Sequence, residues 1–341
     1  MRILVLHAWM KGNLGDVLQL SVLLSALREL GPRVLDLAGY PARPADATAE
    51  VLRLADRYLP DTFPWYWSLS PAPVGTALFE PWWRRRRTAL FARYDAIVCA
   101  PGPYLADYDH RVTSAVADIR IASELGLPVV LSSHSIGPLD EAGLAAVAKA
   151  AVRIAREPST YYYLSERRMS VVLAADLAFL YPFGGAAGRR TGIAPPYRVV
   201  FLRSNNLNAA ALRVEGGALY EGSRLIAAAD EGGLVLATSD RRRDERFLAR
   251  TAPRLGLPWV CCDSVPQLVD LIAGSSGVIS DRYHPAICAA ALGKPAQVLT
   301  NREPHKMEGL QALLAGNTFG ELQELARVGL RSMCGALGRA S

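Results

Sequence analysis

Short apolar runs alternate along the chain with longer segments in which apolar residues recur every three or four positions. Short runs bounded by turn residues are typical of buried strands, and the longer period is typical of helices. The first such unit pairs a strand at Ile3–Leu6 with a helix from Asp16 to Leu30, capped by Asp16 and stopped by Gly31-Pro32. The alternation predicts an α/β protein built on parallel sheets.

The same alternation predicts further elements in both halves. Predicted strands of the first half are Val34–Leu37, Ala96–Cys99, Val129–Ser132 and Ala151–Ile154. Predicted strands of the second half are Val199–Leu202, Leu234–Ala237, Trp259–Cys262, Val278–Ser280 and Gln297–Leu299. Predicted helices there lie near Ser223–Asp230, Asp244–Leu255, Pro266–Ala273 and Ala286–Leu292, followed by a closing helix at Phe319–Leu337.

A stretch without periodicity separates the two halves. Residues 181–196 read YPFGGAAGRRTGIAPP, and dense Gly and Pro are typical of a surface linker. We therefore expect an N-terminal domain over residues 1–183, a linker over 184–197, a C-terminal domain over 198–318 and a closing helix and tail over 319–341. A chain of 341 residues is long enough for two domains.

Composition narrows the class of protein. With 51% hydrophobic and 21% charged residues, the chain is neither disordered nor fibrous. The formal charge of +6 is modest and spread along the chain, so it does not indicate a nucleic-acid partner. The five cysteines lack metal-ligand spacing, which favours a reducing compartment and a cytoplasmic location. No apolar stretch approaches the ~20 residues of a membrane-spanning helix.

Residues 61–94 combine aromatic side chains with a basic run. Peripheral membrane contact, or a cradle for an anionic or sugar ligand, is one interpretation of this pattern. The other is a loop whose aromatics fold onto the domain, followed by a solvated helix. The residues that would make the membrane contact are Trp82, Trp83, Arg84, Arg85, Arg86 and Arg87.

The strongest chemical signal follows the predicted strand Val278–Ser280, where Arg282 and His284 stand two positions apart. Ligands of open α/β sheets bind beyond the carboxyl ends of the strands. Arginine clamps anions, and histidine exchanges protons near neutral pH. We expect this loop to be functional. No second His or Cys stands at ligand spacing, so no metal site is expected.

Other predicted strand ends carry polar or cationic residues. The first loop offers glycines and amides at a helix start but lacks the GxGxxG spacing, and the Ser135 turn lacks the Gly-x-Ser-x-Gly elbow of serine hydrolases. Asn13 and Asp16 are read equally well as functional residues and as helix-capping residues. The cations at the remaining strand ends suit a small, doubly anionic ligand; they are Arg156, Arg203 and Lys306.

Taken in chain order, these motifs resemble those of the polysaccharide pyruvyltransferase family, over about residues 1–310. The match consists of Asn-x-Gly-Asp (Asn13, Gly15, Asp16), Ser-x-x-Gly-Pro (Ser135 to Pro138), Arg-Glu with a following Ser (Arg156, Glu157, Ser159), Asp176, Ser-x-Arg-x-His (Ser280, Arg282, His284), Gly-x-Pro (Gly293, Pro295) and Lys306.

The resemblance implies two Rossmann-like domains in a GT-B-like arrangement with an inter-domain cleft. It also implies transfer of pyruvate from phosphoenolpyruvate to sugar hydroxyls as a ketal, with phosphoenolpyruvate as co-substrate and neither cofactor nor metal. His284 and Arg282 are then expected to be catalytic. The donor would bind at Arg282, Arg203, Lys306 and Ser280, and the acceptor at Asn13, Gly15, Asp16, Gly102, Ser135 and Arg156.

One segment departs from the family pattern. Family members usually carry a glycine run where this chain reads Ala100-Pro101-Gly102-Pro103-Tyr104, and the two prolines stiffen the loop and remove backbone donors. The acceptor is then a polysaccharide, a glycolipid or a smaller sugar-containing molecule. Two other functions fit the same architecture: a GT-B glycosyltransferase that uses a nucleotide sugar, and a non-catalytic binding protein derived from such enzymes.

Overall fold

The computed structural model describes residues 1–40, 44–60, 72–107, 109, 111–183, 192–193, 196–229, 232–300 and 304–339, without the side chains of 47, 72–80 and 304–305. The chain forms two compact units. The N-terminal unit holds Met1–Lys11, Gln19–Leu180 and Leu322–Ser341, and the C-terminal unit holds Gly12–Leu18 and Tyr181–Glu321. The loop after the first strand thus belongs to the C-terminal unit, and the closing helix to the N-terminal unit.

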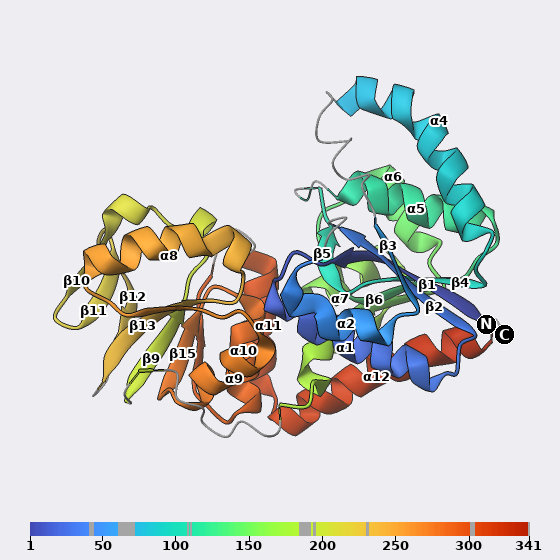
Figure 1. Cartoon of the computed structure of the whole chain (residues 1–341). Coiled ribbons are helices and arrows are strands. Elements are labelled where there is room, and N and C mark those ends of the chain that lie inside the picture. The colour runs from blue at the N-terminus through green and yellow to red at the C-terminus, as the bar shows by residue number, and fades with distance from the viewer. Residues whose placement is uncertain are drawn as a thin grey trace. The chain divides into compact units, whose positions relative to one another are not determined.

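A parallel sheet forms the centre of the N-terminal unit (Figure 1). Its strand order is β3-β2-β1-β4-β6-β7-β8, with β5 added beside β6. The strands are β1 (Arg2–Trp9), β2 (Val34–Tyr40), β3 (Arg57–Pro60), β4 (Ala96–Cys99), β5 (Gly102–Leu105), β6 (Val129–Ile136), β7 (Val152–Ala155) and β8 (Val172–Leu173). The four strands predicted after the first one in this half are confirmed as β2, β4, β6 and β7.

Helices connect these strands. They are α1 (Leu14–Glu29), α2 (Ala49–Leu54), α4 (Ala72–Phe91), α5 (Val112–Glu124), α6 (Glu141–Ala148) and α7 (Pro158–Ser165), and α12 (Phe319–Gly338) follows at the end of the chain; α1 and α12 both begin in the other unit. The cap predicted for α1 was wrong by three residues. Asn13, not Asp16, precedes the helix, and its Oδ1 accepts a hydrogen bond from the Gly15 amide at 3.1 Å. Asp16 instead lies in the first turn, where its charge favours the helix dipole.

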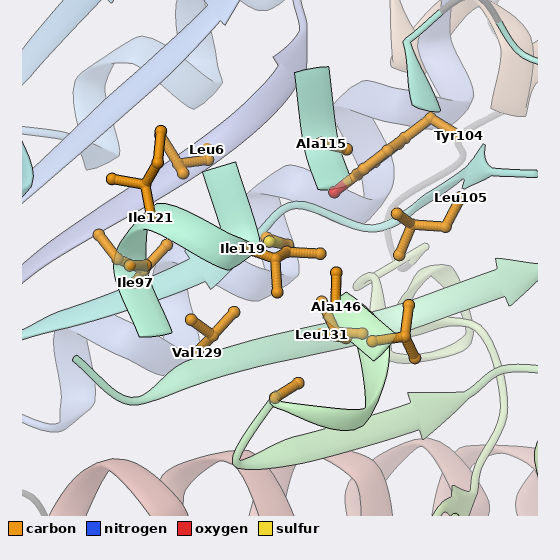
Figure 2. Packing of buried hydrophobic residues seen from close by; sticks show 14 of the residues in the cluster. Leu6, Ile97, Tyr104, Leu105, Ala115, Ile119, Ile121, Val129, Leu131 and Ala146 are labelled. Atoms are coloured by element: carbon orange, nitrogen blue, oxygen red, sulfur yellow. The ribbon is translucent and has the colours of Figure 1, made fainter. Parts of the chain in front are cut away.

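The core of the N-terminal unit lies between this sheet and its helices (Figure 2). Ile97 of β4 and Leu131 of β6 are fully buried and share one cluster with Ile119 of α5. Truncating such a side chain to alanine costs about 2–5 kcal/mol of stability. This packing holds the strand ends in place, and it therefore also fixes where the loops that follow these strands begin.

The C-terminal unit has its own parallel sheet, in the order β14-β13-β9-β15-β16, and an antiparallel sheet of β10, β11 and β12. The strands are β9 (Tyr197–Phe201), β10 (Leu212–Glu215), β11 (Ala218–Glu221), β12 (Arg224–Ala228), β13 (Gly233–Thr238), β14 (Trp259–Cys261), β15 (Gly277–Ser280) and β16 (Ala296–Val298). The helices are α8 (Arg241–Leu255), α9 (Val265–Ala273), α10 (Tyr283–Ala291) and α11 (Pro304–Gly316). The five parallel strands predicted here are confirmed.

The helix predicted near Ser223–Asp230 is wrong, because β12 occupies this segment. β12 pairs antiparallel with β11 across a turn that contains Gly222 at φ 58°. The pairing with β11 defines it as a strand, although the register shifts within the pair and burial does not alternate: Arg224 and Leu225 are exposed, and Ile226 and Ala227 are buried. The apolar run was too short for its period to separate a strand from a helix.

The basic run on α4 does not present all its side chains to solvent. Residues 61–71 lie outside the described part of the chain. Trp83 and Arg87 are buried, the Arg87 guanidinium lies 3.9 Å from the Trp83 ring centroid, and its Nε donates to Asp118 at 3.0 Å. Membrane contact through these two residues is therefore wrong, because they belong to the core. Trp82 and Arg84–Arg86 are exposed. None of the described helices is both long and apolar enough to cross a membrane.

Candidate active site

The side chain of Ser280 holds the turn that follows β15 through two hydrogen bonds to the backbone of Arg282. Ser280 Oγ accepts a hydrogen bond from the Arg282 amide at 2.9 Å and donates one to the Arg282 carbonyl at 2.7 Å. The chain then enters α10 at Tyr283. Arg282 and His284 are 7% and 8% exposed, so the turn holds both side chains at a largely buried strand end.

Two carboxylates of the same unit hold the Arg282 side chain. Its Nη2 is hydrogen-bonded to Asp244 of α8, and its Nη1 lies 3.6 Å from Asp240. Asp244 is itself fixed, since it accepts hydrogen bonds from the Ser204 amide and the Thr238 hydroxyl, each at 3.0 Å. The guanidinium therefore has one defined position, and its charge is compensated by its neighbours.

The loop between β1 and α1 lies against this strand end. Asn13 forms an isolated antiparallel bridge with Asp240, and the Leu14 amide donates to the Ser239 carbonyl at 2.9 Å. Gly15 touches the imidazole of His284: a Cβ at this position would lie 1.9 Å from His284 Nδ1. Asn13 and Gly15, predicted on the acceptor side, are thus brought together with the predicted catalytic pair.

Cationic and aromatic groups complete this cluster. The Tyr283 and His284 rings lie 5.6 Å apart, and Lys306 Nζ is 5.4 Å from the Tyr283 ring centroid. The Arg203 amide donates to both oxygens of Asp281, at 2.9 and 3.1 Å. Burial raises the pKa of the Asp281 carboxyl against the opposing effect of these hydrogen bonds. The predicted donor residues therefore gather at the carboxyl edge of one sheet.

The remaining predicted acceptor residues lie in the N-terminal unit. Ser135 and Arg156 are buried, and the Arg156 guanidinium donates to Ser135 Oγ at 2.7 Å and to Asp176 at 2.8 Å. Gly102 begins β5, where a Cβ would approach the Tyr104 ring to 3.0 Å. The segment predicted as a stiff loop is thus partly a strand, and these groups hold strand ends together.

A second buried polar cluster was missed from the sequence. His7, at φ 63°, and His134 flank the Tyr104 ring at 5.2 and 5.0 Å, and the Tyr104 hydroxyl lies 2.9 Å from His134 Nε2. Burial lowers the pKa of His134 to about 3, so this imidazole is neutral. The available signal was that both histidines fall at predicted strand ends, as His284 does. Across the described residues, no three His, Cys, Asp or Glu gather as metal ligands.

The family model of polysaccharide pyruvyl transferases matches residues 13–303. The chain belongs to this family. The matched range runs from Asn13 past His284, so it includes the loop and the strand end that meet in the C-terminal unit. The resemblance predicted from the motifs is confirmed. No curated protein matches the chain significantly in sequence.

Solved structures share the fold of this polysaccharide pyruvyl transferase family member. UDP-GlcNAc 2-epimerase of Methanocaldococcus jannaschii, in complex with UDP-GlcNAc and UDP, gives a TM-score of 0.57 at 11% identity, covering 97% of this chain and 93% of the other. S. aureus MnaA, solved with UDP, gives a TM-score of 0.57 at 14% sequence identity, covering 98% of this chain and 91% of the other. The Rickettsia bellii 2-epimerase gives 0.55 at 9%, covering 99% and 96%. At such identities the likeness shows the fold alone, and the predicted GT-B-like α/β class is confirmed.

Proposed function

We propose that this protein transfers the pyruvyl group of phosphoenolpyruvate to two hydroxyls of a sugar-containing acceptor, forming a ketal. The observation that carries the proposal is the position of His284. Its ring is fixed against Gly15, beside Tyr283 and within two residues of the anchored Arg282. A proton-transfer group and cations that follow neighbouring strands of one sheet suit an anionic enol ether.

In this mechanism His284 donates a proton to the methylene carbon of phosphoenolpyruvate. The carbon–carbon double bond supplies the electron pair, the methylene becomes a methyl, and C2 becomes oxocarbenium-like. One acceptor hydroxyl adds to C2 and loses its proton. The C2–O bond to phosphate then breaks, the oxygen of a second hydroxyl bonds to C2 to close the ketal ring, and its proton leaves with the inorganic phosphate. A histidine suits these steps because it gives and takes protons near neutral pH.

The donor carries a carboxylate and a phosphate, so its site needs cationic charge. Arg203 and Lys306 supply this charge in the proposal, with Ser280 shaping the loop. Arg282 adds rigidly held N–H groups that can donate hydrogen bonds to phosphoenolpyruvate, although Asp240 and Asp244 compensate much of its charge. We infer that Arg282 directs the donor by geometry more than by net charge.

The acceptor would approach from the loop that lies against His284. Asn13, Gly15 and Asp16 are polar or small groups there, and amide and carboxylate oxygens bind sugar hydroxyls well. Ser135, Arg156 and Gly102 support the N-terminal strand ends in this proposal. The acceptor class is a polysaccharide, a glycolipid or a small sugar-containing molecule, and the reaction would take place in the cytoplasm without a metal.

The test is phosphate release from phosphoenolpyruvate in the presence of candidate sugar acceptors, with the ketal identified by NMR. His284→Ala should fold, as judged by circular dichroism and Tm, and lose transfer by about 10²–10⁴-fold. Lys294→Ala serves as the control, since Lys294 lies outside the cluster around His284. Near-native turnover of His284→Ala would refute the proposed role.

A second candidate function is sugar transfer or isomerisation on a nucleotide sugar. The observation in its favour is the fold shared with enzymes whose structures contain UDP or UDP-GlcNAc. Incubation with a nucleotide sugar and no phosphoenolpyruvate separates the two candidates. Release of the nucleoside diphosphate, or formation of an isomeric sugar, would favour the second.

A further inference from the structure

A cavity of about 310 Å³ lies at the carboxyl edge of the C-terminal sheet. One wall is Leu202, directly after β9, and another is Leu299, directly after β16. Ile226 of β12, in the antiparallel sheet, and Leu207, in the segment between β9 and β10, complete the apolar lining. This volume is at the lower end of natural ligand pockets, which hold about 300 Å³ or more. It is too small for a polysaccharide segment or a long lipid chain.

The polar residues of the cavity are few: Asn206, Arg224, Asp281 and Thr300. Asp281 lines it, next in sequence to Arg282, and already accepts the Arg203 amide and Asn206 Nδ2, the latter at 3.0 Å. The oxygen of that amide, Asn206 Oδ1, is buried and has no hydrogen-bond partner in the described part of the chain. A buried acceptor without a partner favours a ligand that brings an N–H or O–H donor.

A cation stands beside these acceptors. Arg224 lines the cavity, and its side chain is 51% exposed, with Nη1 3.7 Å from Glu221. Arg224 and Ile226, two residues apart on β12, both line the cavity. Leu225, between them, does not line the cavity and is exposed.

The three features together narrow the ligand class. Aliphatic walls fit the two apolar faces of a flat heteroaromatic ring. An N–H on the edge of that ring would donate the hydrogen bond that Asn206 Oδ1 can accept. A saccharide would need more polar partners than these, and an aliphatic chain would leave the buried Asn206 oxygen unmet. The solvent-exposed guanidinium then suits a phosphate attached to the ring through its sugar.

We propose that this cavity binds a nucleotide, with the base between Leu202, Leu207 and Ile226 and the phosphate at Arg224. This inference rests on the proposed function, and its consequence is that the acceptor of the pyruvyl group is a nucleotide-linked sugar. Asp281 connects the cavity to the catalytic loop, because Arg282 follows it directly and His284 stands three residues further on. The nucleotide would thus be bound next to the reacting centre.

Isothermal titration of the full chain with UMP, CMP, AMP and GMP, without phosphoenolpyruvate, tests the proposal. At least one of these nucleotides should bind. Ile226→Trp, which fills the cavity, should weaken the affinity for that nucleotide by about tenfold or more. The matched control Leu225→Trp places the same ring at an exposed position of β12 outside the cavity lining, and this variant should bind the nucleotide as the wild type does.

Arg224→Ala keeps the test decisive if Ile226→Trp does not fold. It should weaken binding of the nucleoside monophosphate but not of the nucleoside. The control Arg213→Ala, at an exposed arginine of β10, should change neither affinity. Absence of binding by all four nucleotides, or affinity unchanged in both cavity variants, would overturn the proposal. Ketal formation on free sugars without nucleotide binding would refute this inference alone. Localised nucleotide binding without phosphoenolpyruvate turnover would refute the proposed function alone.

Discussion

The contact between Gly15 and His284 permits a sharp test of the assembled site. Gly15→Ala adds one methyl group to the first turn of α1, where the backbone suits alanine. That Cβ would lie 1.9 Å from Nδ1 and 2.4 Å from Cγ of His284. Ordinary contact begins at 3.4 Å, so the ring must move by about 1.5 Å.

The expected effect on activity is large and the effect on stability small. A misplacement of about 1 Å at a reacting group can cost about 10²-fold in rate, so we expect kcat to fall by at least that factor. Overpacking costs about 1–3 kcal/mol, and alanine gains up to about 1 kcal/mol over glycine within a helix. The variant should therefore lose no more than about 2 kcal/mol in urea unfolding.

The assay is phosphate release at saturating phosphoenolpyruvate and acceptor, with Gly316→Ala as the control. Gly316 ends α11 in the same unit, and a Cβ there meets nothing within 4 Å. The double variant Gly15→Ala/His284→Ala should recover the stability lost by Gly15→Ala, because the clashing ring is gone. A folded Gly15→Ala protein with kcat within about threefold of wild type would refute the reasoning.

Three further predictions follow from the charged groups. Asp244→Asn should leave Arg282 less firmly held and lower kcat more than it raises KM, as steady-state kinetics will show; an unchanged kcat would count against the positioning role. Arg156→Leu should cost about 3–5 kcal/mol in urea unfolding, because it leaves the Asp176 carboxylate buried without its ion pair; a loss below 1 kcal/mol would contradict this. The pKa of His134 is lowered to about 3, below the unfolded value of about 6.5, so the stability that its neutral ring contributes is present above pH 6.5 and lost as pH falls. The free energy of unfolding should therefore be about 2 kcal/mol lower at pH 5 than at pH 6.5, and His134→Gln should remove this pH dependence.

Much of the fold follows from the sequence because strong periodicity leaves few alternatives. The strand Val278–Ser280 and the helix after it were predictable, since a short buried run and a turn bound them. The antiparallel sheet of β10, β11 and β12 was not. Its strands have four or five residues each, and pairing across glycine turns, rather than local pattern, defines them.

The candidate site was predictable residue by residue but not as an assembly. Strand-end placement singled out Arg282 and His284, and the structure places both at the same buried loop. Neither pattern nor spacing could show that Gly15 would contact His284, or that Asp240 and Asp244 would hold Arg282. These contacts join segments far apart in sequence, and only the tertiary structure brings them together.

The most direct test of the central claim is the isotopic composition of the ketal methyl group formed in deuterium oxide. If a protein acid protonates the methylene of phosphoenolpyruvate, NMR of the wild-type product should show a methyl group carrying a single deuterium, with inorganic phosphate released in equal amount. His284→Gln should form this product far more slowly, by about 10²-fold or more. A product methyl without deuterium, or the same rate of labelling in His284→Gln, would contradict the account.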